Sequence, residues 1–257
     1  MESYDLFSAD YDRFVNWPAR LEYEMPFIER LARSLPAPQR ILDAACGTGR
    51  HVIALAMKGF LTAGADLSRG MIDQARKNAA KATMMLRFEA AGFGELRGLF
   101  HSYDLVLCLG NSLPHVLDRE GLGRALSDFA ACLRPGGKLL IQNRNFDAVM
   151  AAHERWMEPQ SYREGESEWI FLRFYDYEPD GLINFNILTL RREGAGAWKQ
   201  AVTSTRLRPL LQVELVSALD EAGFEQITSY GSMSGDKFDP AASGNLIITA
   251  QLSNVGI

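Results

Sequence analysis

The stretch Ile41-Leu42-Asp43-Ala44-Ala45-Cys46-Gly47-Thr48-Gly49-Arg50 combines an apolar run, a tight glycine turn and the start of a helical pattern. Small residues in such a turn let the backbone approach a ligand closely, and the first N–H groups of the following helix have no partner within it. These donors favour a carboxylate or a phosphate. The stretch therefore predicts a site for a nucleotide-like cofactor; a tight strand-to-helix turn without a ligand is the alternative.

The spacing of the glycines distinguishes two classes of nucleotide cofactor. A dinucleotide fingerprint requires G-x-G-x-x-G, but Val52 occupies the position of the third glycine, which makes a nicotinamide oxidoreductase a poor alternative. An acidic residue, Asp43, stands inside the strand instead, and Asp66 ends the next apolar run. This form resembles motif I of the class I S-adenosylmethionine-dependent methyltransferases. The resemblance implies S-adenosyl-L-methionine as the cofactor.

The composition is that of a globular protein with a small-molecule partner. With 257 residues, 47% of them hydrophobic, the chain buries a full core without a metal or disulfides. Its net charge of −5 argues against nucleic acid as the main partner, because such binding requires a clustered basic face. No apolar run reaches the roughly 18 residues of a membrane span, and residues 1–5 do not begin a targeting leader. We expect a cytoplasmic protein without a membrane partner, folded as a single methyltransferase domain over residues 1–257.

The cysteines and histidines predict no metal site. The cysteines have apolar or small neighbours and no paired spacing, which favours buried thiols in a reducing compartment. The histidines also lack the spacing of metal ligands. The residues concerned are Cys46, Cys108, Cys132, His51, His101, His115 and His153.

Short apolar runs alternate with helical patterns between about residues 40 and 145. The predicted strands are 41–45, 61–65, 84–89, 103–109 and 138–143, and the predicted helices are 50–58, 70–80 and 122–133. This alternation predicts an α/β fold, a Rossmann-like doubly wound sheet of the class I methyltransferase type. The turn Arg134-Pro135-Gly136-Gly137 ends the third helix, because proline cannot extend a helix.

The alternation stops after the fifth strand. Three partly alternating runs follow at 168–177, 182–192 and 198–207, separated by turn residues at 178–181 and 193–196. They predict an inserted antiparallel β-sheet over residues 153–208. The sheet either roofs the substrate side or makes the protein a homo-oligomer, and the two roles are compatible. A helix at 213–222 and strands at 226–230 and 245–252 complete the pattern.

Two further segments resemble one branch of the methyltransferases, the glycine and glycine/sarcosine N-methyltransferases. Residues 108–115 (CLGNSLPH) resemble the C-x-G-N-S-x-x-H segment of that branch, and residues 142–147 (QNRNFD) resemble its H-R-N-Y-D segment. The resemblance assigns substrate binding to Asn111 and Arg144. A guanidinium holds a carboxylate by two parallel hydrogen bonds, which leaves the amine of an amino acid free. The alternatives are a turn residue for Asn111 and a salt bridge to Asp147 or another local acid for Arg144.

The same resemblance implies that the N-terminal segment closes over the cofactor. Tyr11 and Arg20 match the aromatic and arginine contacts of that segment, with Arg20 as the partner of the methionine carboxylate. We expect residues 1–35 to form a lid or helix, and a plain surface helix is the alternative. The predicted cofactor residues are Tyr11, Arg20, Ala45, Gly47, Gly49, Asp66, Leu67, Met71, Gly92, Phe93 and Leu109.

Several of these residues have a competing structural role. Asp66 suits the two ribose hydroxyls, but it is also a possible helix N-cap, for which Ser68 is the better candidate. Met71 either covers the adenine or belongs to the core. The loop that contains Gly92 and Phe93 offers the adenine backbone groups and one aromatic ring.

Departures from the branch leave the methyl acceptor open. Arg206-Leu207-Arg208-Pro209 stands where the relatives place an aromatic residue before the proline, so an extra guanidinium either takes a second carboxylate or lies on the surface. Phe146 replaces the Tyr of H-R-N-Y-D. The amine of a small, glycine-like acceptor is the predicted substrate. An O-methyltransferase for a small acid and a non-catalytic S-adenosylmethionine-binding sensor or structural subunit are the alternatives.

Methyl transfer to a neutral amine depends mainly on positioning. We therefore expect no Ser/His/Asp or Cys/His constellation. His115 is either a proton acceptor or a packed histidine.

Overall fold

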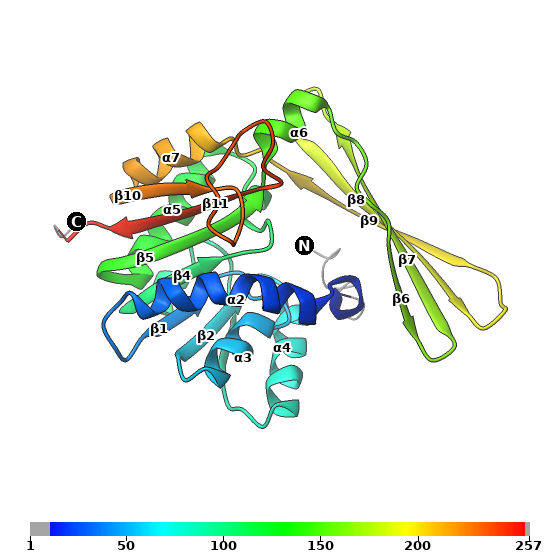
Figure 1. Ribbon diagram of the computed structural model, residues 1–257, viewed down its shortest axis with the longest axis horizontal. Coiled ribbons are helices and arrows are strands. Elements are labelled where there is room, and N and C mark those ends of the chain that lie inside the picture. Colours follow the sequence, from blue (N-terminus) through cyan, green and yellow to red (C-terminus); the bar gives the residue numbers. More distant parts are fainter. Residues whose placement is uncertain (1–10, 255–257) are drawn as a thin grey trace.

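A seven-stranded sheet forms the centre of the molecule in the computed structural model, which describes residues 11–254 (Figure 1). The strand order is β10-β11-β5-β4-β1-β2-β3. Strands β1 to β5 run parallel to one another, and β11 is antiparallel to both of its neighbours. The strands are β1 (Arg40–Asp43), β2 (Leu61–Asp66), β3 (Arg87–Ala90), β4 (Tyr103–Cys108), β5 (Leu133–Arg144), β10 (Phe224–Tyr230) and β11 (Asn245–Leu252). The order reverses between β1 and β4, and ligands of such sheets bind beyond the carboxyl ends at that point.

Helices cover both faces of this sheet, because its central strands are apolar on both sides. On β4, Leu105 and Leu107 pack with residues of α2 and α3, whereas Val106 and Cys108 pack with residues of α5 and α7. The helices are α2 (Trp17–Arg33), α3 (Arg50–Met57), α4 (Arg69–Lys81), α5 (Arg119–Cys132), α6 (Phe146–Ala152) and α7 (Gln212–Glu221), with 3₁₀ turns η1 (Leu96–Gly98) and η2 (Leu113–His115). The predicted doubly wound α/β fold is confirmed.

The predicted elements of the sheet are confirmed, with boundaries that differ by a few residues. The largest difference concerns the turn at residues 134–137. Helix α5 ends at Cys132, as the proline requires, but β5 begins immediately at Leu133. Gly136 has φ +74°, and the pairing of β5 with β4 shifts register there. The turn is therefore an irregular start of β5.

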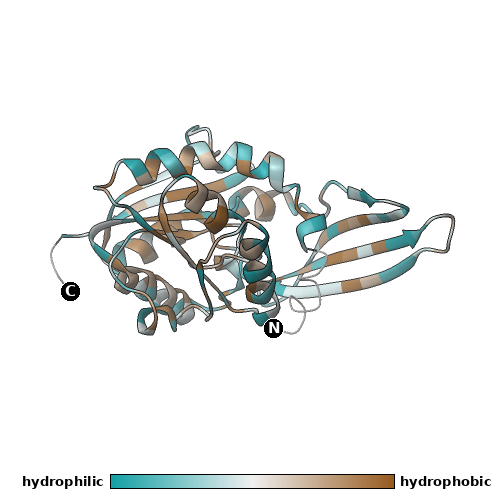
Figure 2. Ribbon diagram, turned by 90° about the horizontal axis from the view of Figure 1, so that it is seen from below, coloured by the Kyte–Doolittle hydropathy of each residue, from teal (hydrophilic) through white to brown (hydrophobic). Residues whose placement is uncertain are grey.

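The inserted sheet has four antiparallel strands in the order β6-β7-β8-β9, between α6 and α7. Its strands are β6 (Gln160–Glu164), β7 (Ser167–Tyr177), β8 (Ile183–Glu193) and β9 (Lys199–Leu207). The last three were predicted, whereas β6 is a short, exposed, mostly polar edge strand without the alternation that would indicate it. Figure 1 shows this sheet as a long blade directed away from the central sheet, and in Figure 2 hydrophobic and hydrophilic residues alternate along it.

The N-terminal segment packs on the body of the molecule. Residues 11–14 are helical, and α2 begins at Trp17, where the Asn16 side chain accepts from the Ala19 N–H. One side of α2 is buried, including Met25 and Ile28, so α2 is more than a surface helix. The rest of the predicted lid, residues 1–10, lies outside the described residues. Between residues 11 and 254, no helix has both the length and the apolar character needed to cross a membrane.

Candidate functional site

The glycine turn after β1 has a backbone that only glycine adopts without strain. Gly47 and Gly49 have φ values of +51° and +77°. A Cβ on Gly49 would lie 2.9 Å from side-chain atoms of both Ala75 and Phe88. Gly49 is also the N-cap of α3, and no side chain of residues 11–254 caps that helix. The first N–H groups of α3 therefore remain available as donors, as the sequence predicts.

Two carboxylates hold this turn. The Asp66 Oδ2 atom accepts from the Gly47 N–H at 2.8 Å, and its Oδ1 atom accepts from the Ser68 N–H at 2.9 Å. Asp43 is buried, and its Oδ1 atom accepts from the Ala45 N–H at 3.2 Å. Burial raises the pKa of Asp43 to about 6, against the opposing charge of His51. Ser68 caps α4 by accepting from the Met71 N–H at 3.1 Å, so the cap belongs to Ser68 rather than to Asp66.

Tyr11 and Arg20 each lie against a glycine of the central sheet's loops. A ring carbon of Tyr11 is 3.7 Å from the position that a Cβ on Gly47 would take. The Arg20 guanidinium is 3.3 Å from the corresponding position on Gly110, in the loop after β4. Burial raises the pKa of Tyr11, and the Arg20 cation works against that rise. The segment before β1 thus brings a phenol and a guanidinium against two glycine backbones of the sheet.

A buried network fixes Arg20. Its Nε donates to both carboxylate oxygens of Glu24 at 3.1 Å, and the same carboxylate contacts His51 Nε2 at 2.7 Å. Burial works to raise the pKa of Glu24, but the hydrogen bond from His51 and the charge of Arg20 outweigh it and lower the pKa. Because His51 belongs to α3, the network ties α2 to the helix that follows the glycine turn.

Asp12 is a positioning residue that the sequence did not reveal. Its Oδ1 atom accepts from Thr48 Oγ1 at 2.6 Å and from Trp17 Nε1 at 2.9 Å, and its Oδ2 atom accepts from Arg50 and from Asn78. Burial works to raise the pKa of Asp12, but hydrogen bonds from Arg50 and Thr48 hold it below its ordinary range. One carboxylate therefore joins the N-terminal segment to the glycine turn and to α4. An acidic residue beside Tyr11 was the only signal in the sequence.

The predicted adenine loop lies next to the end of β2. A Cβ on Gly92 would lie 2.9 Å from Leu67 Cδ1, so these two predicted residues are in contact. Leu67 is exposed and Met71 is buried. Phe93 packs edge-on against Phe129 of the core, with ring centroids 5.1 Å apart. Leu67 is thus the most accessible member of this group, and Phe93 and Met71 also serve packing.

The loop after β4 is held by β5. The Gly110 N–H donates to Gln142 Oε1 at 2.7 Å, and the Asn111 N–H donates to the Gln142 carbonyl at 3.1 Å. Asn111 has φ +63°, a conformation that asparagine tolerates better than most residues. Its Oδ1 atom accepts from the Arg144 N–H at 2.9 Å. Asn111 is therefore a turn residue that also fixes the end of the strand carrying Arg144. Leu109, which precedes this turn, is buried.

Arg144 forms the salt bridge that was its alternative role, and its partner is another local acid, Glu154, rather than Asp147. The Arg144 Nη2 donates to Glu154 Oε2 at 3.0 Å, and both side chains are partly exposed. The Asp147 carboxylate instead accepts from the Gln212 N–H at the start of α7. Arg144 also acts electrostatically on Tyr175 and Arg173 of β7. Of these two inserted-sheet residues, Arg173 was not singled out from the sequence.

His115 and the three cysteines are the remaining groups that could take part in chemistry. His115 contacts Thr205 Oγ1 through Nδ1 at 3.4 Å, and burial lowers its pKa to about 4, which leaves the ring neutral near pH 7. All three cysteines are buried and free. Within residues 11–254, no group of three or more His, Cys, Asp or Glu side chains is arranged to hold a metal ion.

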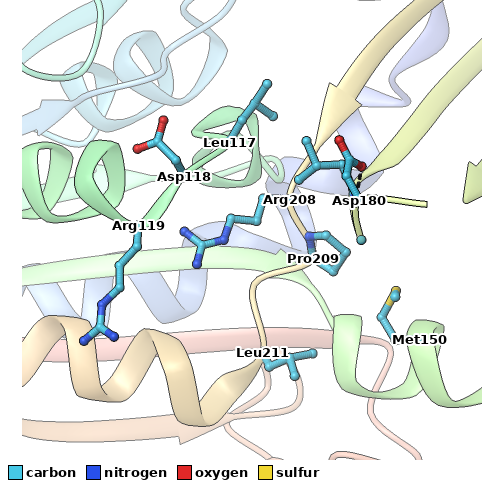
Figure 3. A pocket seen from close by; sticks show the side chains of 10 residues that line it. Leu117, Asp118, Arg119, Met150, Asp180, Arg208, Pro209 and Leu211 are labelled. Atoms are coloured by element: carbon cyan, nitrogen blue, oxygen red, sulfur yellow. Dashed lines mark hydrogen bonds between the residues drawn. The ribbon is translucent and has the colours of Figure 1, made fainter. Parts of the chain in front are cut away.

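The two extra arginines after β9 also have acidic partners. Arg206 pairs with Asp180 and Arg208 with Glu214. Arg208 lines a cavity of about 390 Å³ between the start of α5, α6 and the β7–β8 turn, shown in Figure 3 with Arg119 and Met150. None of the predicted cofactor or substrate residues lines this cavity.

Comparisons with known proteins agree with the geometry. Residues 41–137 match the family described as "Methyltransferase domain". The glycine/sarcosine N-methyltransferase of Aphanothece halophytica is 31% identical over 88% of this chain and 80% of that protein. The enzyme of the same name from Parasynechococcus marenigrum (strain WH8102) is 29% identical over 91% of this chain and 79% of that protein. A solved S-adenosylmethionine-dependent methyltransferase from Clostridium acetobutylicum ATCC 824 superposes with a TM-score of 0.78 at 19% identity, covering 97% of this chain and 99% of that one.

Proposed function

Because this chain belongs to the S-adenosylmethionine-dependent methyltransferases, we propose that it methylates the amine of a small, carboxylate-bearing substrate such as glycine or sarcosine. The observation that carries this proposal is the position of Arg144 at the carboxyl end of β5, next to Asn111 of the β4 loop. The names of the glycine/sarcosine N-methyltransferase relatives support the same substrate class.

The residues around the glycine turn fit the cofactor. Gly47 and Gly110 leave space that a Cβ would fill, and Tyr11 and Arg20 close that space from the other side. The Arg20 guanidinium suits the methionine carboxylate, and the two oxygens of Asp66 suit a ribose with two hydroxyls. In this proposal Leu67 and Gly92, which are in contact with each other, meet the adenine. The chemistry that the bound cofactor supplies is a methyl group on a positively charged sulfur.

The protein's contribution to the reaction is positioning and exclusion of water. Arg144 holds the acceptor by its carboxylate and leaves its amine free, and Asn111 keeps Arg144 in register. The in-line displacement needs no covalent intermediate with the protein. The neutral His115 ring accepts a proton only if it reaches the amine; otherwise the proton leaves to solvent.

The inserted sheet roofs the substrate side in this proposal. Phe171 of β7 packs edge-on against Phe14 of the N-terminal segment, with ring centroids 5.4 Å apart. Tyr11 and Phe14 pack on the cluster formed by Trp169, Phe171 and Ile187. This apolar contact seals the site on the side away from the central sheet and strengthens the polar contacts beneath it.

Turnover with labelled S-adenosylmethionine tests the proposed function. The acceptors are glycine, sarcosine, dimethylglycine, an amine without a carboxylate and a small acid without an amine, with mass detection of the product. We expect labelled product only from an acceptor with both groups. Methylation of the small acid would identify an O-methyltransferase, and cofactor binding without turnover of any acceptor would favour a sensor.

The Arg144→Lys variant tests the substrate contact. An ammonium keeps the charge but not the two-pronged hydrogen bonding, so we expect kcat/KM for the best amino-acid acceptor to fall at least about tenfold, or about 1.4 kcal/mol. Cofactor affinity should remain at the wild-type level, which calorimetry with S-adenosylhomocysteine measures. Wild-type kinetics in Arg144→Lys would remove Arg144 from the substrate site.

A further inference from the structure

One face of β7 carries a single charged residue in an otherwise aromatic row. Side chains alternate between the faces of a strand, so this row consists of residues two apart. Its members are Trp169, Phe171, Arg173, Tyr175 and Tyr177. Trp169, Phe171 and Tyr175 are buried, so this is the face that packs toward the N-terminal segment and α6. Arg173 therefore places a guanidinium inside the contact that roofs the site.

The Arg173 guanidinium has no acidic partner within residues 11–254. Its central carbon lies 5.3 Å from the centre of the Phe14 ring, and its Nε is buried without a hydrogen-bond acceptor. Arg173 is partly buried, and a cation removed from water without a counter-charge destabilises the protein that contains it. Binding of an anion from outside the chain would supply the missing counter-charge.

A second cation lies nearby. Burial and the charge of Arg144 both lower the pKa of Arg173, so the two guanidiniums repel each other. Burial raises the pKa of Tyr175 to about 12, while both arginines act to lower it. Tyr175 packs against Phe146, which follows Arg144 by two residues, with ring centroids 6.4 Å apart. The end of β5 that carries Arg144 and the part of β7 that carries Arg173 thus meet at Tyr175.

The charges of this region indicate how much negative charge the missing ligand carries. Glu154 pairs with Arg144 and balances one of the two positive charges. Arg173 is left over, so the group requires one further negative charge. Arg206 and Arg208, which are candidates for a second carboxylate, already pair with Asp180 and Glu214.

We propose that Arg173 is a substrate-binding residue that holds the single carboxylate of the methyl acceptor together with Arg144. This inference rests on the proposed function for the identity of the acceptor and adds that the acceptor is a monocarboxylate. It also gives the inserted sheet a direct role in recognition, in addition to excluding water.

The test compares Arg173→Met, Arg173→Lys and Arg163→Met with the wild type. Methionine keeps apolar volume and removes the charge, and lysine keeps the charge without the planar fork. Arg163 is a matched control, because it lies on the exposed edge strand β6 and its partner Glu168 keeps Arg192. The readouts are KM and kcat for the best amino-acid acceptor, binding of acetate to the complex with S-adenosylhomocysteine, and the melting temperature.

In Arg173→Met we expect KM to rise at least about tenfold and acetate binding to weaken by a similar factor, with S-adenosylhomocysteine affinity unchanged. The KM and the acetate affinity of Arg173→Lys should lie between those of Arg173→Met and the wild type. Those of Arg163→Met should equal the wild-type values. The melting temperature of Arg173→Met should not fall, because the unpaired charge is removed; a structural arginine would give the opposite result.

A KM within about twofold of the wild type in Arg173→Met overturns the inference while leaving the proposed function intact. Failure of the wild type to bind acetate also overturns it. If acetate binding depends on Arg173 but no carboxylate-bearing amine is methylated, the proposed function fails and the carboxylate site stands. Higher affinity for a dicarboxylate than for acetate would refute the single-carboxylate assignment.

Discussion

Asp43 and Asp66 show how burial and hydrogen bonding give two nearby carboxylates different properties. Asp43 lies inside β1, buried, with one hydrogen bond from the Ala45 N–H. Asp66 lies at the end of β2, partly exposed, and its oxygens organise the Gly47 and Ser68 N–H groups. Ligands of such sheets bind at the strand ends, so Asp66 is the carboxylate that we propose as a cofactor contact.

The Asp66→Ala variant should bind S-adenosylhomocysteine about 1 to 3 kcal/mol more weakly than the wild type in calorimetry, because donor hydroxyls lose a charged acceptor. Ser68→Ala is the control, since it removes the cap of α4 and costs about 1 kcal/mol of stability without touching the proposed ribose contact. Equal affinity of the wild type and Asp66→Ala would exclude Asp66 from the cofactor site.

At the scale of elements, the N-terminal segment and α2 are attached to the site by polar side chains as well as by apolar packing. Asp12 joins residues 11–14 to the glycine turn, and Glu24 joins α2 to α3 through His51. These contacts are buried or half-buried, where hydrogen bonds to a charged group contribute more than they do in water. The two attachments place Tyr11 and Arg20 over the sheet.

Loss of the Asp12 attachment should therefore weaken cofactor binding. In Asp12→Ala the donors of Thr48, Trp17 and Arg50 lose their acceptor, and we expect S-adenosylhomocysteine affinity to fall about tenfold and trypsin to cleave the N-terminal segment faster. Glu22→Ala, on the exposed side of α2, should leave both unchanged. Wild-type affinity in Asp12→Ala would mean that the segment contributes nothing to binding.

For the molecule as a whole, the proposed site gathers residues from both sheets and from the segment before the first strand. The central sheet supplies the turn glycines, Asp66 and Arg144, and the inserted sheet supplies Arg173. The N-terminal segment lies between them, in contact with Gly47 on one side and Phe171 on the other. Closure of the site thus depends on the packing of three separate parts of the chain.

The free energy of unfolding of the whole protein should depend on pH through the raised pKa of Asp43. Its pKa is raised from an ordinary value of 3.8 to about 6, so the folded state holds the proton more tightly than the unfolded state. The stabilisation is complete below about pH 4 and is lost as the pH rises through about 6. In urea unfolding, Asp43→Asn should flatten this decline and be up to about 3 kcal/mol more stable than the wild type at pH 8.

Asp73→Asn is the matched control for that measurement, because Asp73 is exposed on α4. Its stability should follow the wild-type curve. Parallel curves for Asp43→Asn and the wild type between pH 4 and 8 would show that Asp43 is ionised throughout.

The sequence by itself determined the order of strands and helices, the glycine turn and the ends of the strands that carry Asp66 and Arg144. These features follow from local periodicity and from backbone conformations that few residues adopt, so they are readable from neighbouring residues alone. The same local signal missed β6, whose exposed polar residues lack an apolar face.

Only the tertiary structure decided which distant side chains meet. Asp12 reaches Asn78, Arg144 pairs with Glu154 rather than Asp147, and Arg173 is brought to the region of Arg144. A period-two pattern places Arg173 on one face of β7, but it does not say what that face covers. The physical reason is that hydrogen bonds and charge interactions depend on distance in space, whereas sequence patterns record only distance along the chain.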